Sequence, residues 1–366
     1  MKKMNKRIAC TVMAAAMAGT MMTGCGEKLD GTQTVATIGE ENVTLGMASY
    51  MLRDQQAQTE SYMAMFAQSY GMDVSAMSIW EDEAEEGVTY GESTKNDVMD
   101  TIKTLYALKA HAEEYDVEIT EEDSAKIAEA VSTFMEENTA EAIEELAVSE
   151  EDLTTYLELV TIRERMYDPM VADVDTEVSD EEANQTKITL VKVSTEGTET
   201  DEEGNTIELT EDEIAAKKEL AEEILEAIQK EDDIAAADIS TIVSEIDSES
   251  ASVSTPSFTT SGVEEISVDE AVVDEVLKLE DGELVDKVIE GDGAYYVARL
   301  DHMLDEDATE SKIQLIISDR ESEMYNTLLE EWTEATEMTI NEDVWEKVEL
   351  TNSKSFQYKT EEETEE

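Results

Sequence analysis

Histidines and cysteines are few in this chain, and the two histidines lie 191 positions apart. The 366 residues include two histidines, His111 and His302, and two cysteines, Cys10 and Cys25. There is no HExxH motif, GxSxG motif, Walker loop or dinucleotide fingerprint, and the acidic loop at residues 201–205 lacks the alternating ligands of an EF-hand. The sequence therefore predicts no cofactor and no zinc centre, and it predicts a structural role for His111. Calcium binding at another acidic cluster stays open.

The charge of the chain excludes one class of partner. The formal net charge is −68, from 93 acidic and 25 basic residues. Nucleic-acid binding needs clustered Lys and Arg, so a nucleic-acid partner is not expected. Such acidity is typical of a solvated surface. With 40% hydrophobic residues the chain can still bury a core, and its length suits two or three modest domains. Residues 351–366 are predicted to form an acidic disordered tail.

The N-terminus has the pattern of a secretion signal. Four basic residues lie within residues 1–7, and the uncharged apolar run at residues 8–22 is too short to cross a bilayer comfortably. Met22-Thr23-Gly24-Cys25 then resembles a bacterial lipobox. The resemblance implies a signal peptide over residues 1–24, a lipid on Cys25 and a tether over residues 25–34. The chain would then be anchored at the extracytoplasmic face of the bacterial cell membrane. The alternative is a plain secreted protein with Cys25 free.

The first half of the chain predicts a helical lobe over residues 35–178. Residues 35–44 indicate two small strands around a turn, and Thr44 begins a helix. Further helix starts are marked by a hydroxyl residue followed three positions later by an acid, which can cap a first turn. These pairs are Thr94 and Asp97, Thr120 and Asp123, Ser149 and Asp152, and Ser179 and Glu182. Pro169 marks the end of the last long helix.

Methionine is concentrated near the start of this lobe. Six methionines fall within 31 positions: Met47, Met51, Met63, Met65, Met72 and Met77. Because methionine is flexible and polarisable, a methionine-rich surface can repack around many apolar partners. The other interpretation is that these are core residues at helical spacing. Both interpretations remain open on the sequence alone.

The second half predicts a mixture of strands and helices. Alternating apolar residues indicate strands at residues 187–194, 284–289 and 294–300, the last two joined by a Gly-Asp-Gly turn. Between them, the pattern predicts helices at residues 210–228, 234–239 and 267–277, with a Ser/Thr-rich loop at residues 248–262. After them, residues 308–338 predict one long helix.

Residues 277–300, LKLEDGELVDKVIEGDGAYYVARL, resemble the end of a parvulin-type prolyl isomerase domain. The matching positions are Leu279, Gly282, Glu283, Val285, Tyr295 and Leu300. The order of elements extends this resemblance over residues 186–301. The opening at residues 35–44, just after the lipobox, is similar to the start of the N-terminal lobe of the PrsA and SurA foldases.

The resemblance implies an α+β protein with three parts. A helical chaperone lobe like that of SurA is followed by a parvulin-like domain, which is a small antiparallel sheet with flanking helices. A C-terminal helical segment at residues 302–350 then returns to pack on the first lobe. The rival interpretation of that segment is a helical hairpin within the second domain.

The resemblance also implies where an isomerase site would lie. In parvulins two histidines and an Asp or Cys surround an apolar cup for the proline ring, and the polar groups favour the twisted amide. The first histidine position falls near Thr189, with Leu190 as the neighbouring register, and the second falls on Tyr296. Thr and Tyr can each donate and accept a hydrogen bond, so these two are the candidate catalytic residues.

The remaining members of such a site are implied less directly. Asp247 or Glu249 could supply the acid, and Phe258 could line the substrate cup or be an ordinary core aromatic. His302 lies six positions past the expected histidine and is predicted to face solvent.

Three functions follow from these patterns. The first is a lipid-anchored foldase whose parvulin-like domain is degenerate, with unfolded secreted polypeptides as partners and no cofactor. The second is an active peptidylprolyl cis-trans isomerase that uses Thr189 and Tyr296. The third is a solute-binding lipoprotein, which the long helical first half disfavours.

Overall fold

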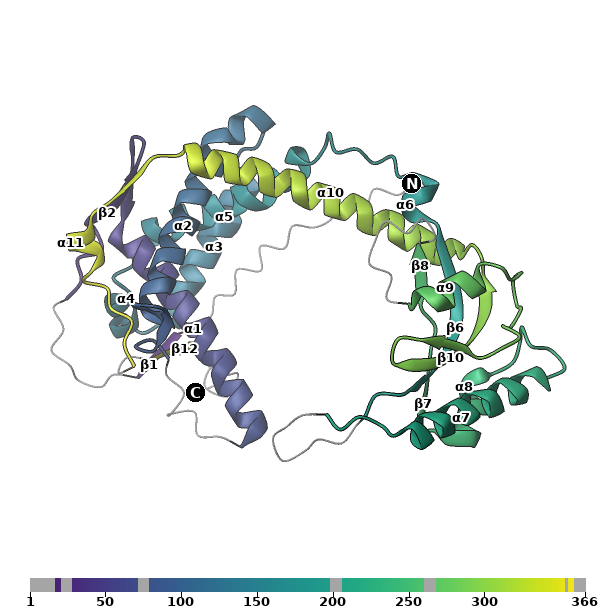
Figure 1. Ribbon diagram of the computed structural model, residues 1–366. Coiled ribbons are helices and arrows are strands. Elements are labelled where there is room, and N and C mark those ends of the chain that lie inside the picture. The colour runs from purple at the N-terminus through teal and green to yellow at the C-terminus, as the bar shows by residue number, and fades with distance from the viewer. Residues whose placement is uncertain are drawn as a thin grey trace. The chain divides into compact units, whose positions relative to one another are not determined.

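The computed structural model describes residues 17–20, 28–71, 79–197, 206–259, 268–352 and 355–358. The chain divides into two compact units (Figure 1). Unit 1 comprises residues 1–173 and 322–366, and unit 2 comprises residues 174–321. Among the described residues, no helix combines the length and the apolar character that a membrane span requires.

Unit 1 is built mainly from helices. They are α1 (Leu45–Tyr70), α2 (Tyr90–His111), a 3-10 turn (Ala112–Tyr115), α3 (Glu121–Glu137), α4 (Ala140–Leu146) and α5 (Glu150–Met170). Thr44 caps α1 by accepting the N–H of Met47, and α5 ends one residue after Pro169. The capping boxes predicted at Thr120 and Ser149 are confirmed.

The helix start predicted at Thr94 is wrong. Helix α2 begins four residues earlier, where Thr89 and Glu92 form the capping box. Thr94 lies inside the helix, and its hydroxyl donates to the Tyr90 carbonyl at 2.8 Å. Thr89 can act as the cap because its backbone is extended at the end of the hairpin β4 (Glu83–Glu85) and β5 (Val88–Thr89).

The two ends of the chain complete unit 1 together. Strands β2 (Thr34–Ile38) and β3 (Glu41–Thr44) form an antiparallel sheet with β11 (Met338–Ile340), in the order β11-β2-β3. Helix α11 (Glu342–Trp345) follows β11 and places Val344 and Trp345 in the core that α1, α2, α3 and α5 share.

Helix α10 (Glu306–Ala335) begins in unit 2 and ends in unit 1. Its last turns pack Tyr325, Leu328, Leu329 and Trp332 against a small core of α2 and α5 residues. His111 stacks on Trp332 with ring centroids 4.1 Å apart. Residues 322–335 of α10 therefore belong to unit 1, where His111 has a structural contact, whereas residues 306–321 belong to unit 2.

The last described strand lies where the sequence predicts a disordered tail. Strand β12 (Ser355–Tyr358) pairs antiparallel with β1 (Met17–Thr20). Phe356 is only 1% exposed and joins the main core of unit 1. Residues 355–358 of the predicted tail therefore form a strand, because Phe356 packs in the core beside α1.

Unit 2 is a small antiparallel sheet with helices. Its elements are α6 (Asp180–Ala183), β6 (Gln185–Ser194), α7 (Glu211–Gln229), α8 (Ile239–Asp247), β7 (Ala251–Ser254), β8 (Ser257–Thr259), α9 (Glu270–Val276), β9 (Ile289–Gly291) and β10 (Ala294–His302). The strand order is β7-β6-β10-β9, and β8 pairs with the start of β6. With the helical unit 1, this confirms the α+β class.

Several local predictions for unit 2 need correction. The helix predicted at residues 234–239 is a turn, and α8 begins at Ile239 with Asp238 as its cap. The predicted loop at residues 248–262 contains β7 and β8, which pair with β6 on either side of Pro256. Only Ile289 of the strand predicted at residues 284–289 lies in β9, although Leu284 forms an isolated bridge with Arg299.

Candidate functional site

The two candidate catalytic residues lie on opposite faces of the unit 2 sheet. Thr189 of β6 is paired with Arg299 of β10, and Tyr296 of β10 is paired with Lys192 of β6. Directly paired residues share a face, and successive residues of a strand alternate between faces. Positions 296 and 299 differ by three, so Thr189 and Tyr296 point away from each other and cannot form one network.

The Thr189 hydroxyl is committed to a buried network. It donates to Asp301 Oδ2 at 2.8 Å and accepts from Arg299 Nη2 at 3.2 Å. Arg299 Nε donates to Asp301 Oδ1 at 2.6 Å, and Arg299 Nη1 donates to the carbonyls of Ile234 and Ala237. Thr189 itself is 5% exposed. These contacts join β6 and β10 to the turn after α7, so the Thr189 hydroxyl has a structural role.

Tyr296 lies on the other face of the sheet, directly opposite the exposed Lys192. The residues of β6 on its face include Ile188 and Leu190, which are apolar and buried. Leu190 is the alternative position for the first histidine. It lies on the same face as Tyr296, but its side chain has no polar group. Burial raises the pKa of Tyr296, and the nearby carboxylates of Asp269 and Asp292 raise it further. The phenol therefore stays protonated at neutral pH.

Asp269 organises the end of the sheet beside Tyr296. Its Oδ1 accepts the Ala271 N–H at 2.9 Å and caps α9, while its Oδ2 accepts the Asp292 N–H at 2.8 Å in the β9–β10 turn. A Cβ on Gly291 would come within 2.3 Å of Asp269 Oδ2 and 2.8 Å of Tyr296 Cε2. The helix predicted at residues 267–277 begins at Glu270, and residue 267 lies outside the described residues. Asp269 stands two positions before the apolar run that starts at Ala271, and this spacing could have predicted the cap.

The other predicted members of the site include Phe258 and Asp247. Phe258 is paired with Thr186, so it shares the face of Ile188 and Tyr296, but it is 4% exposed and belongs to the core. Asp247 Oδ1 accepts the N–H groups of Glu249 and Ser250, each at 2.9 Å, and these hydrogen bonds lower the pKa of Asp247. Asp247 is thus a loop cap after α8.

The histidine near this site faces solvent, as predicted. The His302 side chain is 59% exposed, and its Nδ1 lies 3.5 Å from Asp281 Oδ2. The lipidation candidate Cys25 lies outside the described residues.

The surface that stands out chemically is the second half of α1. Its first half is buried, whereas Tyr62, Met65, Phe66 and Tyr70 are 65%, 63%, 43% and 69% exposed. Residues 61–71 carry no charge, although 32% of the whole chain is charged. The rings of Phe66 and Tyr70 lie 4.7 Å apart. We call these four exposed side chains the α1 face.

The methionines divide between the two interpretations that the sequence left open. Met47 and Met51 are 1% and 8% exposed and lie in the core, whereas Met65 belongs to the α1 face. Met63 is half-buried. Met72 and Met77 lie outside the described residues.

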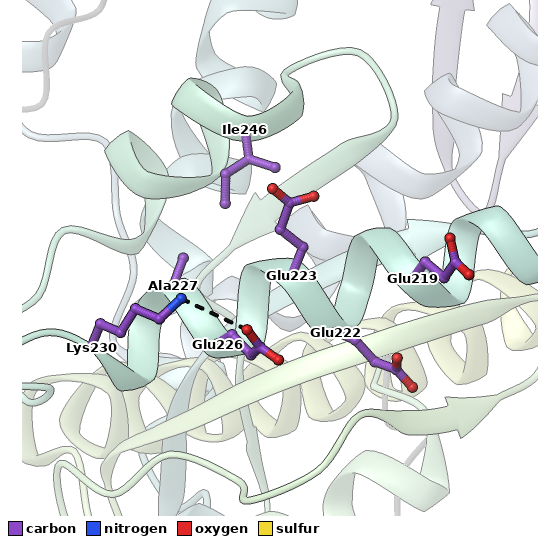
Figure 2. Close-up of a pocket in the computed structure, with 7 residues that line it drawn as sticks. All are labelled: Glu219, Glu222, Glu223, Glu226, Ala227, Lys230 and Ile246. Carbon is purple, nitrogen blue, oxygen red and sulfur yellow. Dashed lines mark ion pairs between the residues drawn. The ribbon is translucent and has the colours of Figure 1, made fainter.

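Two hollows in unit 2 are separate from the candidate catalytic residues. Figure 2 shows the first, of about 480 Å³, where Glu219, Glu222, Glu223 and Glu226 project from one helix. Lys230 lies 3.7 Å from Glu226 there. The second, of about 580 Å³, lies around Leu279 and Leu284. Neither is lined by Thr189 or Tyr296, and across the described ranges no three His, Cys, Asp or Glu side chains converge to hold a metal ion.

Comparisons with known proteins found similarity among solved structures. No family model and no curated protein sequence matches the chain. Among solved structures, the chain is similar to the foldase protein PrsA from Lactococcus lactis, with 14% identity, 86% of this chain and 97% of that chain covered, and a TM-score of 0.34. It is also similar to the peptidylprolyl isomerase PrsA from Bacillus cereus, with 16% identity, coverages of 73% and 96%, and a TM-score of 0.29. A third match is the foldase protein PrsA from Streptococcus pneumoniae, with 13% identity, coverages of 85% and 96%, and a TM-score of 0.24.

Proposed function

We propose that this chain is a lipid-anchored, extracytoplasmic foldase that holds unfolded secreted polypeptides on the α1 face. Its parvulin-like unit 2 is catalytically degenerate. The observation that carries the proposal is the exposure of Tyr62, Met65, Phe66 and Tyr70 on an uncharged stretch of a strongly acidic chain.

An exposed cluster of large apolar side chains is typical of an interaction surface. Aromatic and methionine side chains adapt to many apolar partners, so binding would be weak and broad, as suits unfolded chains of varied sequence. The acidic remainder of the surface keeps a complex with an unfolded client soluble. The client is therefore held by apolar contacts while the charge prevents aggregation.

The geometry of unit 2 supports the degenerate role. An isomerase must stabilise a twisted amide with aimed polar groups. Here the Thr189 hydroxyl is hydrogen-bonded to Arg299 and Asp301, and Tyr296 lies on the opposite face of the sheet. Membrane anchoring rests on the lipobox-like sequence that ends at Cys25.

The test compares holding with isomerisation in the same protein. The chain should suppress the aggregation of reduced, unfolded lysozyme and should not accelerate proline isomerisation in a protease-coupled peptide assay. Replacing Tyr62, Met65, Phe66 and Tyr70 with Ser should remove most of the suppression. The matched control replaces the exposed Leu304 and Leu315 with Ser, and it should leave suppression unchanged.

Two results would overturn parts of the proposal. Acceleration that disappears in Tyr296→Phe would identify an active isomerase. Full suppression by the four-residue variant would place client binding elsewhere. For the anchor, Cys25→Ser should release the protein from the membrane fraction, and retention of that variant would remove lipidation from the proposal.

A further inference from the structure

Strand β12 is held on its two edges by different partners. On one edge, the Phe356 N–H donates to Glu60 Oε2 at 3.1 Å and the Tyr358 N–H donates to Ser61 Oγ at 3.3 Å, both on α1. On the other edge, β12 pairs with β1, where Ser355 is opposite Thr20 and Gln357 is opposite Ala18. Successive residues of a strand direct their main-chain groups to opposite edges. The N–H and C=O groups of Ser355 and Gln357 therefore face β1.

Strand β1 lies within the leader that the proposed function removes. Cleavage before Cys25 would take Met17–Thr20 away and leave the main-chain groups of Ser355 and Gln357 without a strand partner. A strand edge with unpaired N–H and C=O groups is a template for another extended chain.

After cleavage, β12 would still be held by contacts that do not involve the leader. The Phe356 ring is buried with the Arg53 guanidinium 5.0 Å from its centroid. The Tyr358 hydroxyl donates to Asp54 Oδ1 at 2.7 Å. These contacts to α1 would keep β12 extended after cleavage, so the free edge would be preorganised for pairing.

We propose that this edge of β12 binds an extended, uncharged segment of an unfolded client by antiparallel strand addition. This inference rests on the proposed function and locates part of its client site. The leader segment seated there, Met-Ala-Gly-Thr, is itself uncharged and extended, and it indicates the chemistry that the edge accepts. In the precursor it blocks the site.

The α1 face lies on the helix that holds the other edge of β12. Ser61, which accepts the Tyr358 N–H, is followed directly by Tyr62, and the other three members of the α1 face lie on the next two turns of the same helix. Main-chain pairing does not depend on client sequence, whereas adjacent apolar side chains select apolar segments. Together they suit a binder of many unfolded chains.

The first experiment uses the mature chain, residues 25–366 with Cys25→Ser, and a fluorescent peptide of residues 14–23. The register places Ala18 in a hydrogen-bonded pair and Gly19 in a non-hydrogen-bonded pair. Methylating the Ala18 nitrogen of the peptide should weaken binding at least tenfold, measured by fluorescence anisotropy. Methylating the Gly19 nitrogen should change binding less than twofold. Equal effects of the two methyl groups, or no binding of the unmodified peptide, would overturn the proposal.

The second experiment changes the protein. Gln357→Pro removes the N–H that faces the bound strand and should abolish peptide binding. The peptide scan on the unchanged protein keeps the test valid where this variant loses structure. A precursor that retains residues 1–24 should bind at least tenfold more weakly than the mature chain, and equal binding would contradict occupation by the leader.

The two proposals fail in different ways. If the mature chain suppresses aggregation through the α1 face but does not bind the peptide, strand addition is wrong and the holding function stands. If light scattering shows that the mature chain dimerises and that Gln357→Pro makes it monomeric, the occupant is a second copy, which also overturns the proposal.

Discussion

Replacement of Asp301 by Asn tests whether the network around Arg299 stabilises unit 2. The Arg299 and Asp301 side chains are only 12% and 13% exposed, and their closest atoms are 2.6 Å apart. The change keeps the shape of the side chain but removes the charge that balances the guanidinium. Breaking a buried ion pair by changing one partner costs about 3–5 kcal/mol. An amide oxygen can still accept a hydrogen bond, so we expect the free energy of unfolding of unit 2 to fall by about 3 kcal/mol.

Urea titration converts this loss into a measurable shift. For a unit of this size the dependence of unfolding free energy on urea is about 2 kcal/mol per molar, so the midpoint should fall by about 1.5 M. The three tryptophans, Trp80, Trp332 and Trp345, all belong to unit 1. Tryptophan fluorescence therefore follows unit 1, while far-UV circular dichroism follows both units. The variant should gain an earlier transition by circular dichroism, with the fluorescence midpoint unchanged.

A clear negative result is available for this prediction. The control Asp286→Asn changes an exposed carboxylate and should leave both curves in place. If Asp301→Asn behaves like this control, the network does not stabilise unit 2 and the structural role given to Thr189 is wrong. If both probes move together, the two units unfold as one.

The remaining predictions concern packing, protonation and charge. Gly291→Ala should lower the unfolding free energy of unit 2 by roughly 1–3 kcal/mol, because its Cβ would meet Asp269 and Tyr296, and urea unfolding should show this loss. Burial opposes ionisation of Asp123, but hydrogen bonds from Thr120 and the Arg165 cation outweigh it and hold the Asp123 pKa below its usual 3.8. Because the pKa of Asp123 is lower in the folded than in the unfolded chain, its carboxylate stabilises unit 1 above the unfolded pKa. This stabilisation is lost as the pH falls through the folded pKa. Asp123→Asn should therefore flatten the fall in tryptophan-detected stability between about pH 5 and about pH 3, and an unchanged slope would refute this. Raising NaCl from about 0.01 M to about 0.15 M shortens the screening length from about 30 Å to about 8 Å, so the melting temperature of this strongly acidic chain should rise, and a fall would contradict self-repulsion.

Local chemistry made part of the fold predictable. The capping boxes at Thr120, Ser149 and Thr210 join residues three positions apart, so their spacing is visible in the sequence. Strand β6 is also visible, because Ile188, Leu190, Val191 and Val193 follow one another closely in its sequence. Strands β7 and β8 are short and rich in serine, and they are strands only because distant β6 pairs with them.

The site was less predictable because it depends on strand register. Thr189 and Tyr296 each fall near a position that the family resemblance marks. Whether they meet depends on which residue of β6 lies opposite which residue of β10, and a shift of one residue reverses the face. The sequence also did not predict the exposure of the α1 face. Met51 and Met65 lie on the same helix, but Met51 is buried and Met65 is exposed.

The path of the chain through unit 1 has a consequence for its own synthesis. The chain leaves unit 1 after residue 173 and re-enters it at residue 322. Until residues 325–332 have emerged, Ile162 and Met166 lack the aromatic and leucine side chains that cover them in the finished protein. Unit 2 is continuous in sequence and can close first, so this chain carries its own unshielded apolar surface while residues 174–324 are being synthesised.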